Sequence, residues 1–180
     1  MTAPIAAWQQ AVTTAWNSLA AGQPGPPGDR DRQVRHAIDR ARSAIGTQYA
    51  WGGGNKTGVT QGETDHGGDA DAHGDYTHTG FDCSGLMMYA FGDNPATHVI
   101  RGSQNEYNTG GTQVPYAQRE PGDMIFYGGP TSIHHVALYT GKNAQGQDMM
   151  VEAEESGTRV HEVPVRITGD LSRTVVRPIK

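Results

Sequence analysis

The sequence predicts an α+β domain, and three observations lead to this prediction. Apolar residues in the first half of the chain recur at helical spacing, whereas runs of β-branched, aromatic and alternating residues fill the second half. The segments between those runs are short, which is typical of antiparallel neighbours. We therefore expect helices first, then a helix that carries the single cysteine, and then about five strands in a meandering antiparallel sheet packed against that helix.

The first 30 residues predict a helix and a linker ahead of the main domain. Residues 1–21 contain an apolar stripe at helical spacing, so they predict an N-terminal amphipathic helix that docks on its own domain. The Pro/Gly-rich segment 22–30, with the run GQPGPPG, predicts a stiff linker, and residues 31–180 form the main domain. The opening run MTAPIAAWQQAV lacks the features of a secretory signal, so we expect either no export by that route or a chain cut from a longer polypeptide.

Two helices are predicted in the main domain before the strands begin. The first runs from about Asp31 to Ile45 with one apolar stripe, and Gly46 supplies a left-handed stop. The second lies in FDCSGLMMYAFG, where Asp82 is suited to cap the free backbone NH groups and Gly92 ends the run. The cysteine therefore occupies the first turn of a helix.

Five strands follow, in the runs MIFYG, HHVALYTG, MMVEA, TRVHEVPV and RTVVRPI. In HHVALYTG, strict alternation places His134 with Val136 on one face of the strand and His135 with Ala137 on the other. Only one of the two histidines can therefore face the cysteine. The next strand offers Glu152 across a hairpin from the histidine strand.

Composition excludes several classes of function. The formal net charge is −5, which disfavours nucleic acid or an anionic membrane surface as the main partner. No apolar run approaches the roughly 20 residues that cross a bilayer, so we expect no membrane insertion. The chain has one cysteine, so it forms no internal disulfide and keeps a free thiol.

Cys83 has two interpretations from its surroundings. A free cysteine is often a small buried hydrophobe. In the first turn of a helix, however, the dipole and the unpaired NH groups favour a thiolate, which is the nucleophile. The charge of Asp82 opposes this effect, so a basic partner is required, and His135 with Glu152 as the group that orients its ring fits that need. Glu152 has a second interpretation as a solvated residue of the sheet face, in which case His161 or a histidine of the loop is the next candidate.

Four ordered motifs, YAWGGG, FDCSGL, PGDMIFY and HHVALYTG, resemble those of the NlpC-type cell-wall peptidases, a papain-like cysteine hydrolase family. The resemblance covers about residues 31–165. It implies a papain-like fold in which Cys83 is the nucleophile, His135 the base and Glu152 the third residue, at a position where histidine is common. It also implies that Tyr49 lines the oxyanion site, and that two neighbours of the nucleophile help to receive the amino end of the substrate. These neighbours are Asp82 and Ser84.

The resemblance implies a cysteine endopeptidase of peptidoglycan stem peptides, which cuts an amide between D-glutamate at its γ-carboxyl and the diamino acid. It implies no cofactor and no metal in the site. Such an enzyme is secreted or associated with the cell wall, here by a route that the chain does not reveal. It serves in wall remodelling or as the toxic end of an antibacterial effector, which has an immunity protein as a partner.

Two other functions stay open from the sequence. A papain-like acyltransferase, transglutaminase or deamidase that acts on proteins or lipids uses the same cysteine and histidine. A binding module without activity uses the Asp/His-rich residues 54–80 to hold a metal. Within this polar insertion, DADAHGD is similar to the start of a calcium loop, but Gly80 stands where a bidentate carboxylate is needed. Zinc bound by its histidines is an alternative, and we favour a polar, mobile flap beside the active site.

Overall fold

The computed structural model describes residues 28–180, and the predicted N-terminal helix and most of the predicted linker lie outside them. Its centre is an antiparallel sheet with the strand order β3-β8-β4-β5-β6-β7. The strands are β3 (Thr112–Pro115), β4 (Met124–Gly129), β5 (Ser132–Lys142), β6 (Asp148–Glu152), β7 (His161–Pro164) and β8 (Thr174–Arg177). The predicted α+β class is confirmed, with six strands in this sheet rather than about five.

The predicted meander holds for only part of the sheet. Strands β4 to β7 follow one another as antiparallel neighbours, but β8 returns to the other side of β4 and pairs there with β3. Strand β3 was missed because TQVP is short and ends in proline, which is depleted in strands. Both departures depend on pairings between residues far apart in the chain, which alternation within one run cannot reveal.

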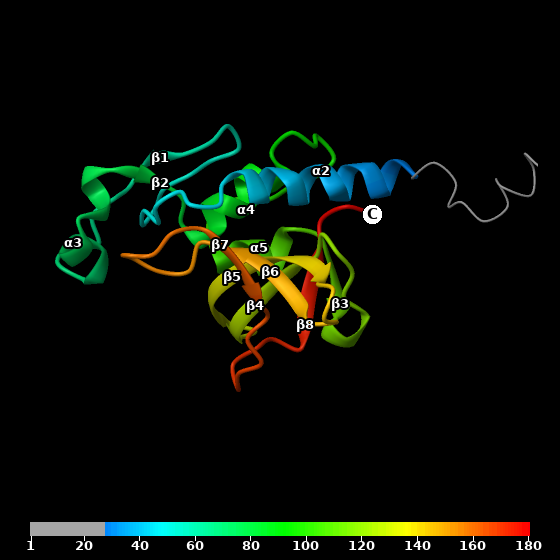
Figure 1. Cartoon of the computed structure of the whole chain (residues 1–180). Helices are drawn as coiled ribbons and strands as arrows, with labels where there is room; N and C mark the ends of the chain where they lie inside the picture. The colour runs from blue at the N-terminus through cyan, green and yellow to red at the C-terminus, as the bar shows by residue number, and fades with distance from the viewer. Residues whose placement is uncertain (1–27) are drawn as a thin grey trace, which may run out of the picture.

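Helices α2 (Asp29–Ser43) and α4 (Cys83–Phe91) cover one face of the sheet (Figure 1). Helix α2 begins two residues before the predicted start, and Gly46 adopts the expected left-handed φ of 88°. Ile45, however, is 46% exposed and does not extend the apolar stripe, because the helix ends before it. A third helix, α5 (Ser103–Thr109), was not predicted, since its sequence SQNEYNT is polar.

Two apolar clusters hold the sheet, one on each face. The first lies between the sheet and the helices, and it includes Val34 and Ile38 of α2 with Leu86 and Phe91 of α4. The second lies on the opposite face around Tyr127, Tyr139, Met150 and Val175. Val136 and Leu138 belong to the first cluster and Ala137 and Tyr139 to the second, so the predicted alternation of β5 holds in this part of the strand.

The insertion 54–80 is a folded unit rather than an irregular loop. It contains β1 (Thr60–Gln61) paired with β2 (Thr79–Gly80), the helix α3 (Asp69–His73) and a 3₁₀ turn, and it extends beyond the sheet near the C-terminal end of α2 (Figure 1). Asp65 accepts backbone hydrogen bonds from three residues at the start of α3. Asp75 is buried and accepts from the Trp51 amide and the Ser156 hydroxyl, which ties the insertion to the rest of the domain.

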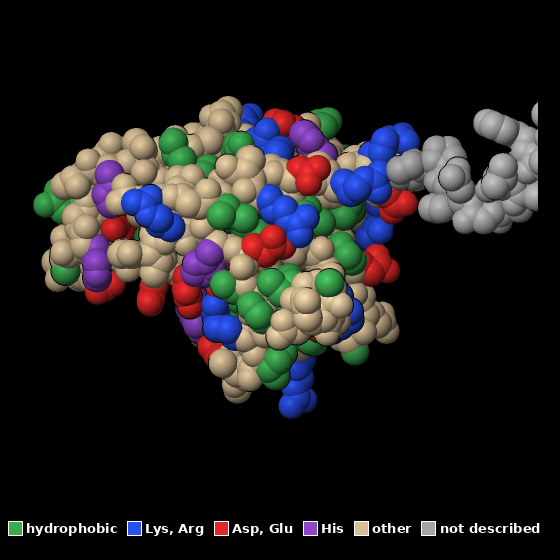
Figure 2. Space-filling model, viewed as in Figure 1, with side chains coloured by type: hydrophobic (Ala, Val, Ile, Leu, Met, Phe, Trp, Pro, Cys, Tyr) green, Lys and Arg blue, Asp and Glu red, His purple; other side chains and the backbone are tan. Residues whose placement is uncertain are grey.

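The surface agrees with the charge of the chain. On the face shown in Figure 2, acidic and basic side chains are interspersed and no broad basic patch forms. Within residues 28–180, no helix has the length and apolar character needed to cross a membrane.

Candidate active site

A pocket of about 540 Å³ lies where the first turn of α4, the start of β5 and several loops meet. It is lined by every residue that the sequence singled out for the site except Glu152, which lies behind His135 and contacts it. Those lining residues are Tyr49, Asp82, Cys83, Ser84 and His135. The fold therefore brings together side chains that are far apart in the sequence, from Tyr49 to His135.

Cys83 is the first residue of α4, as predicted. Asp82 is the N-cap residue and accepts a hydrogen bond from the Gly85 amide at 2.6 Å. A Cβ atom on Gly85 would overlap the carbonyl oxygen of Gly53, so only glycine lets the first turn of the helix lie this close to the YAWGGG loop. The carbonyl oxygen of Gly53, in the same loop, accepts a hydrogen bond from the Asp82 amide. This contact fixes the start of the helix and so the position of the thiol.

The helix start alone does not produce a thiolate at Cys83. Burial raises the pKa of the thiol above its ordinary value, and the nearby carboxylate of Asp82 acts in the same direction. Hydrogen bonding from the backbone of Val136 and Ser84 lowers the pKa but does not compensate. The expectation that a basic partner is needed therefore agrees with the structure. Val136 directly follows His135, so the thiol lies against the part of β5 that carries the predicted base.

His135 is buried and faces Glu152, whereas His134 is exposed and contacts Asp170. The His135 Nε2 atom lies 2.6 Å from Glu152 Oε2, and within residues 28–180 its Nδ1 atom makes no hydrogen bond. This leaves Nδ1 as the ring nitrogen free to receive a proton.

Strict alternation does not describe the start of β5. The register with β4 shifts between Tyr127 and Gly128, and Ile133 belongs to the same apolar cluster as Val136 although the two are three positions apart. His134 lies in this irregular stretch and is exposed, so alternation does not decide the face on which it lies. β-Bulges redirect side chains in this way and are common beside active sites.

Glu152 is fully buried, so its interpretation as a solvated residue is wrong. One oxygen of its carboxylate makes a hydrogen bond with His135, and the other makes one with His161 at 3.2 Å. The guanidinium of Arg166 contacts both oxygens. Burial by itself raises the pKa of Glu152, but the hydrogen bonds from His135 and Arg166 outweigh burial and lower this pKa to about 2. Glu152 is therefore an anion at neutral pH.

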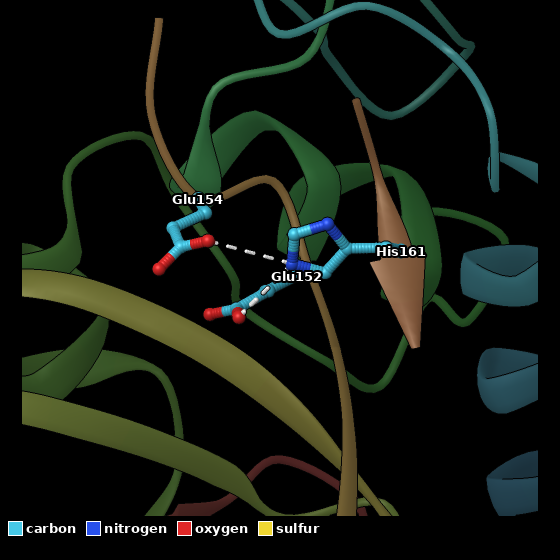
Figure 3. A group of neighbouring side chains, drawn as sticks. All are labelled: Glu152, Glu154 and His161. Carbon is cyan, nitrogen blue, oxygen red and sulfur yellow. Dashed lines mark hydrogen bonds and ion pairs between the residues drawn. The ribbon is translucent and has the colours of Figure 1, made fainter. Parts of the chain in front are cut away.

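Glu152, Glu154 and His161 form the one group of three metal-ligand side chains within residues 28–180 (Figure 3). The His161 Nε2 atom lies near both carboxylates, 3.2 Å from Glu152 and 3.6 Å from Glu154. Arg166 also contacts both carboxylates, so a fixed positive charge already lies beside them. No such group forms among the described His and Asp side chains of the insertion, which were considered as metal ligands only in the alternative to a polar flap.

Tyr49 and Arg101 complete the wall of the pocket beside the thiol. Burial raises the pKa of Tyr49, and the nearby charge of Cys83 raises it further, so the phenol stays protonated and can donate a hydrogen bond. Arg101 pairs with Asp82 at 3.0 Å and also donates to the backbone oxygens of Gly53 and Gly54. Ser84 is buried and donates to Asp82 at 3.0 Å.

Sequence reasoning missed Arg101, Arg166 and the direct contact of His161 with Glu152. His161 was considered only as a replacement for Glu152, but strand β7 pairs with β6 so that His161 stands directly opposite Glu152. Both arginines lie in segments outside helices and strands, where periodicity gives no signal. A buried carboxylate on a predicted strand, which needs a cation, was the one available indication of Arg166.

Comparison with known proteins places this site in a family. Residues 46–175 match the model of the NlpC/P60 family. The chain is 40% identical over 136 residues to the peptidoglycan endopeptidase RipA of Mycolicibacterium smegmatis. The aligned residues cover 76% of this chain and 24% of RipA. The peptidoglycan endopeptidase RipB of Mycobacterium tuberculosis is 37% identical, and the chain spans 59% of its length.

Solved structures agree with these matches. The peptidoglycan hydrolase RipB from M. tuberculosis superposes with a TM-score of 0.68 at 33% identity, covering 99% of this chain and 87% of that one. RipD from the same organism is described as a non-catalytic NlpC/p60 domain protein adapted to peptidoglycan binding. It superposes with a TM-score of 0.64 at 32% identity, covering 81% of this chain and 96% of that one.

Proposed function

This chain belongs to the NlpC/P60 family, and we propose on that premise that it is a cysteine endopeptidase that hydrolyses an amide bond in peptidoglycan stem peptides. The observation that carries the proposal is the presence in one pocket of Cys83 at a helix start and of His135 held by the buried anion Glu152. The chain spans about a quarter of the length of RipA and 59% of RipB, so the proposal concerns the activity of this segment.

The chemistry follows from the residue types. His135 takes the proton of Cys83 at its free Nδ1, and the resulting imidazolium lies between the thiolate and the Glu152 anion. The opposite charges stabilise each other, which overcomes the raised pKa of the isolated thiol. The thiolate attacks the amide carbonyl, and His135 then protonates the leaving amine, after which water hydrolyses the acyl-enzyme.

Tyr49 and the NH groups at the start of α4 are proposed to bind the oxyanion. The raised pKa of Tyr49 keeps its hydroxyl a donor, which this role requires. Asp82 and Ser84 are proposed to border the position of the substrate's amino end. Most of the hydrogen-bonding capacity of Asp82 is already used by Ser84, Gly85 and Arg101, so its contribution to binding is mainly to shape this wall.

The proposed scissile bond joins the γ-carboxyl of D-glutamate to the diamino acid of the stem peptide. Relatives named as peptidoglycan endopeptidases favour hydrolysis of the wall over acyl transfer or deamidation of proteins or lipids. Action on this substrate requires a location outside the cell membrane, in the wall or its vicinity.

A second candidate function is peptidoglycan binding without cleavage, as described for RipD. The Cys83, His135 and Glu152 arrangement argues against it, because a binding module has no need for a nucleophile and a base held by a buried anion.

The test uses defined muropeptides with a single diamino acid, incubated with the protein and analysed by mass spectrometry. We expect two products separated at the D-glutamate to diamino acid bond, and no products with the Cys83→Ala variant. Binding of intact muropeptides by the wild-type protein without cleavage would support the RipD-like alternative. Release of ammonia, or a new amide with an added amine, would support the deamidase or transferase alternative.

A further inference from the structure

The guanidinium of Arg166 is the main partner of the buried Glu152 carboxylate besides His135. It contacts both carboxylate oxygens, one of them at 2.8 Å, in the bidentate arrangement that suits a planar guanidinium. It also contacts Glu154 at 3.2 Å. Arg166 follows β7 in the chain and is about one third exposed on the wall of the pocket.

Strand β4 fixes the position of Arg166. The guanidinium carbon of Arg166 lies 5.1 Å from the centre of the ring of Tyr127, which belongs to this strand. The Tyr127 hydroxyl also donates a hydrogen bond to the Arg166 carbonyl oxygen at 3.3 Å. The Tyr127 ring also lies 5.7 Å from the His135 ring. Arg166, Tyr127 and His135 therefore surround Glu152 as one packed group.

A fully buried carboxylate needs donors for both oxygens and a nearby positive charge. His135 supplies one donor, but it carries a positive charge only after it has taken the proton of Cys83. His161 adds a single contact at 3.2 Å. Arg166 alone provides a permanent charge and a geometry that fixes the plane of the carboxylate, and so the direction in which Glu152 holds the His135 ring.

We propose that Arg166 is a positioning residue for the reaction: it holds Glu152 ionised and oriented, so that Glu152 fixes His135 Nε2 and leaves Nδ1 directed at Cys83. The inference rests on the proposed cysteine peptidase function. The groups that face Glu152 are His135 from β5, His161 from β7, Tyr127 from β4, and Arg166 with Glu154 from the adjoining loops. Arg166 acts through Glu152 and makes no contact with the reacting atoms in this scheme.

The first test measures alkylation of Cys83 by iodoacetamide as a function of pH, which needs no peptidoglycan. The thiolate is the reactive form, so the rate reports the Cys83 and His135 ion pair. We expect Arg166→Met to lower the rate near pH 7 by about 10-fold to 100-fold, the value of one charge-assisted hydrogen-bonded pair. Arg166→Lys keeps the charge but cannot contact both carboxylate oxygens in the same planar arrangement. Its alkylation rate should therefore lie between those of Arg166→Met and wild type.

Arg42→Met is the matched control. Arg42 makes a similar two-oxygen contact with Glu162 on β7, but neither residue lines the pocket. This variant should alkylate at the wild-type rate. A wild-type pH profile in a folded Arg166→Met protein, or an equal loss in Arg42→Met, would overturn the positioning role.

A double-mutant comparison keeps the test decisive if Arg166→Met alone fails to fold. In a Glu152→Gln background the buried charge is absent, so Arg166→Met no longer leaves an unpaired anion. Because Arg166 acts through Glu152, we expect the double variant to be no slower than Glu152→Gln alone. A further loss of about 10-fold in the double variant would contradict the inference.

Muropeptide hydrolysis separates this inference from the proposed function. We expect Arg166→Met to lower kcat with little change in KM. A rise in KM alone would mean that Arg166 binds substrate instead of positioning Glu152. If wild type cleaves no muropeptide while alkylation responds as expected, the proposed function fails and the positioning of the ion pair stands.

Discussion

Two carboxylates with arginine partners lie at the same pocket, Asp82 half-buried in its wall and Glu152 fully buried behind His135, and their surroundings differ. At the start of α4, Asp82 pairs with Arg101 through one oxygen, and its other oxygen accepts from Ser84 and Gly85. At the end of β6, Glu152 is held by Arg166 through both oxygens, and also by two histidines.

The two pKa values move in opposite directions. Burial raises the pKa of Asp82, and the Gly85 amide, the charge of Arg101 and the Ser84 hydroxyl offset this only in part. For Glu152 the donors outweigh burial, and the pKa falls to about 2. An arginine neighbour alone therefore does not decide the charge of a buried acid. The number and geometry of strong donors decide it, and this separates an acid that caps a helix from one that supports a base.

The largest expected effect lies on the strand side of this comparison, at the two adjacent histidines. We expect His135→Ala to be nearly as inactive as Cys83→Ala, because it removes the base, whereas His134→Ala should keep most of the activity. His134 is exposed and pairs with Asp170 at 3.2 Å. Rates on a defined muropeptide would check this, and the reverse order would mean that the bulge in β5 presents the other ring to Cys83.

The second prediction compares the two carboxylates directly by activity. Glu152→Ala should lose on the order of 10²-fold to 10⁴-fold in kcat, the range that a misoriented base costs, and Glu152→Gln should retain more because it keeps an acceptor. Asp82→Asn should lose much less, because asparagine still caps a helix. Full activity in a folded Glu152→Ala protein would reduce the site to a Cys83 and His135 dyad.

The third prediction is that the opposite pKa shifts of Glu152 and Asp82 change the free energy of unfolding in opposite directions as pH changes. The pKa of Glu152 is lowered from 4.5 to about 2, so its ionised form contributes roughly 3 kcal/mol above pH 4.5 and loses this as pH falls toward 2. The destabilisation caused by Glu152→Gln should therefore shrink on acidification.

For Asp82 the sign is reversed. Its pKa is raised, so the fold favours the neutral acid, and stability is lost as pH rises from the ordinary value of 3.8 through the folded pKa. Asp82→Asn should become more stable relative to wild type over that rise. Urea denaturation at pH 3, 5 and 7 measures both slopes, and parallel slopes for the two variants would remove the contrast.

The smallest expected effect concerns Glu106, a third acid beside Asp82 and Arg101. It is fully buried, and neither of its carboxylate oxygens has a hydrogen-bond partner within the described part of the chain. Burial and the charge of Asp82 raise its pKa well above the ordinary value, so the neutral acid is the folded form.

Glu106→Gln copies that neutral form. It should leave activity within about twofold, because the change is nearly isosteric. Its stability relative to wild type should be unchanged near pH 4 and should increase as pH rises, since wild type then loses stability as Glu106 is driven to ionise. Thermal unfolding at pH 4 and pH 8 tests this, and a variant that is less stable at both values would mean that Glu106 has a partner as an anion.

Local sequence rules were sufficient for the cysteine helix and for the central strands. The N-cap role of Asp82, the end of α4 at Phe91 and the alternation of β5 beyond Val136 each depend on residues within a few positions of one another. The α+β class followed from the same local patterns. For the site residues, Cys83 and His135 came from motifs whose order along the chain carried the resemblance.

Tertiary structure decided the surroundings of Glu152 and the edges of the sheet. Whether Glu152 faced solvent or His135 depended on the pairing of β6 with β5 and β7, and the contact from Arg166 depended on a segment with no periodic pattern. The sequence by itself singled out the groups proposed to carry the chemistry, because residue type and local capping are short-range properties. Only the tertiary structure decided which of the acids is held as an anion, because that balance of burial against donors is set by residues distant in the chain.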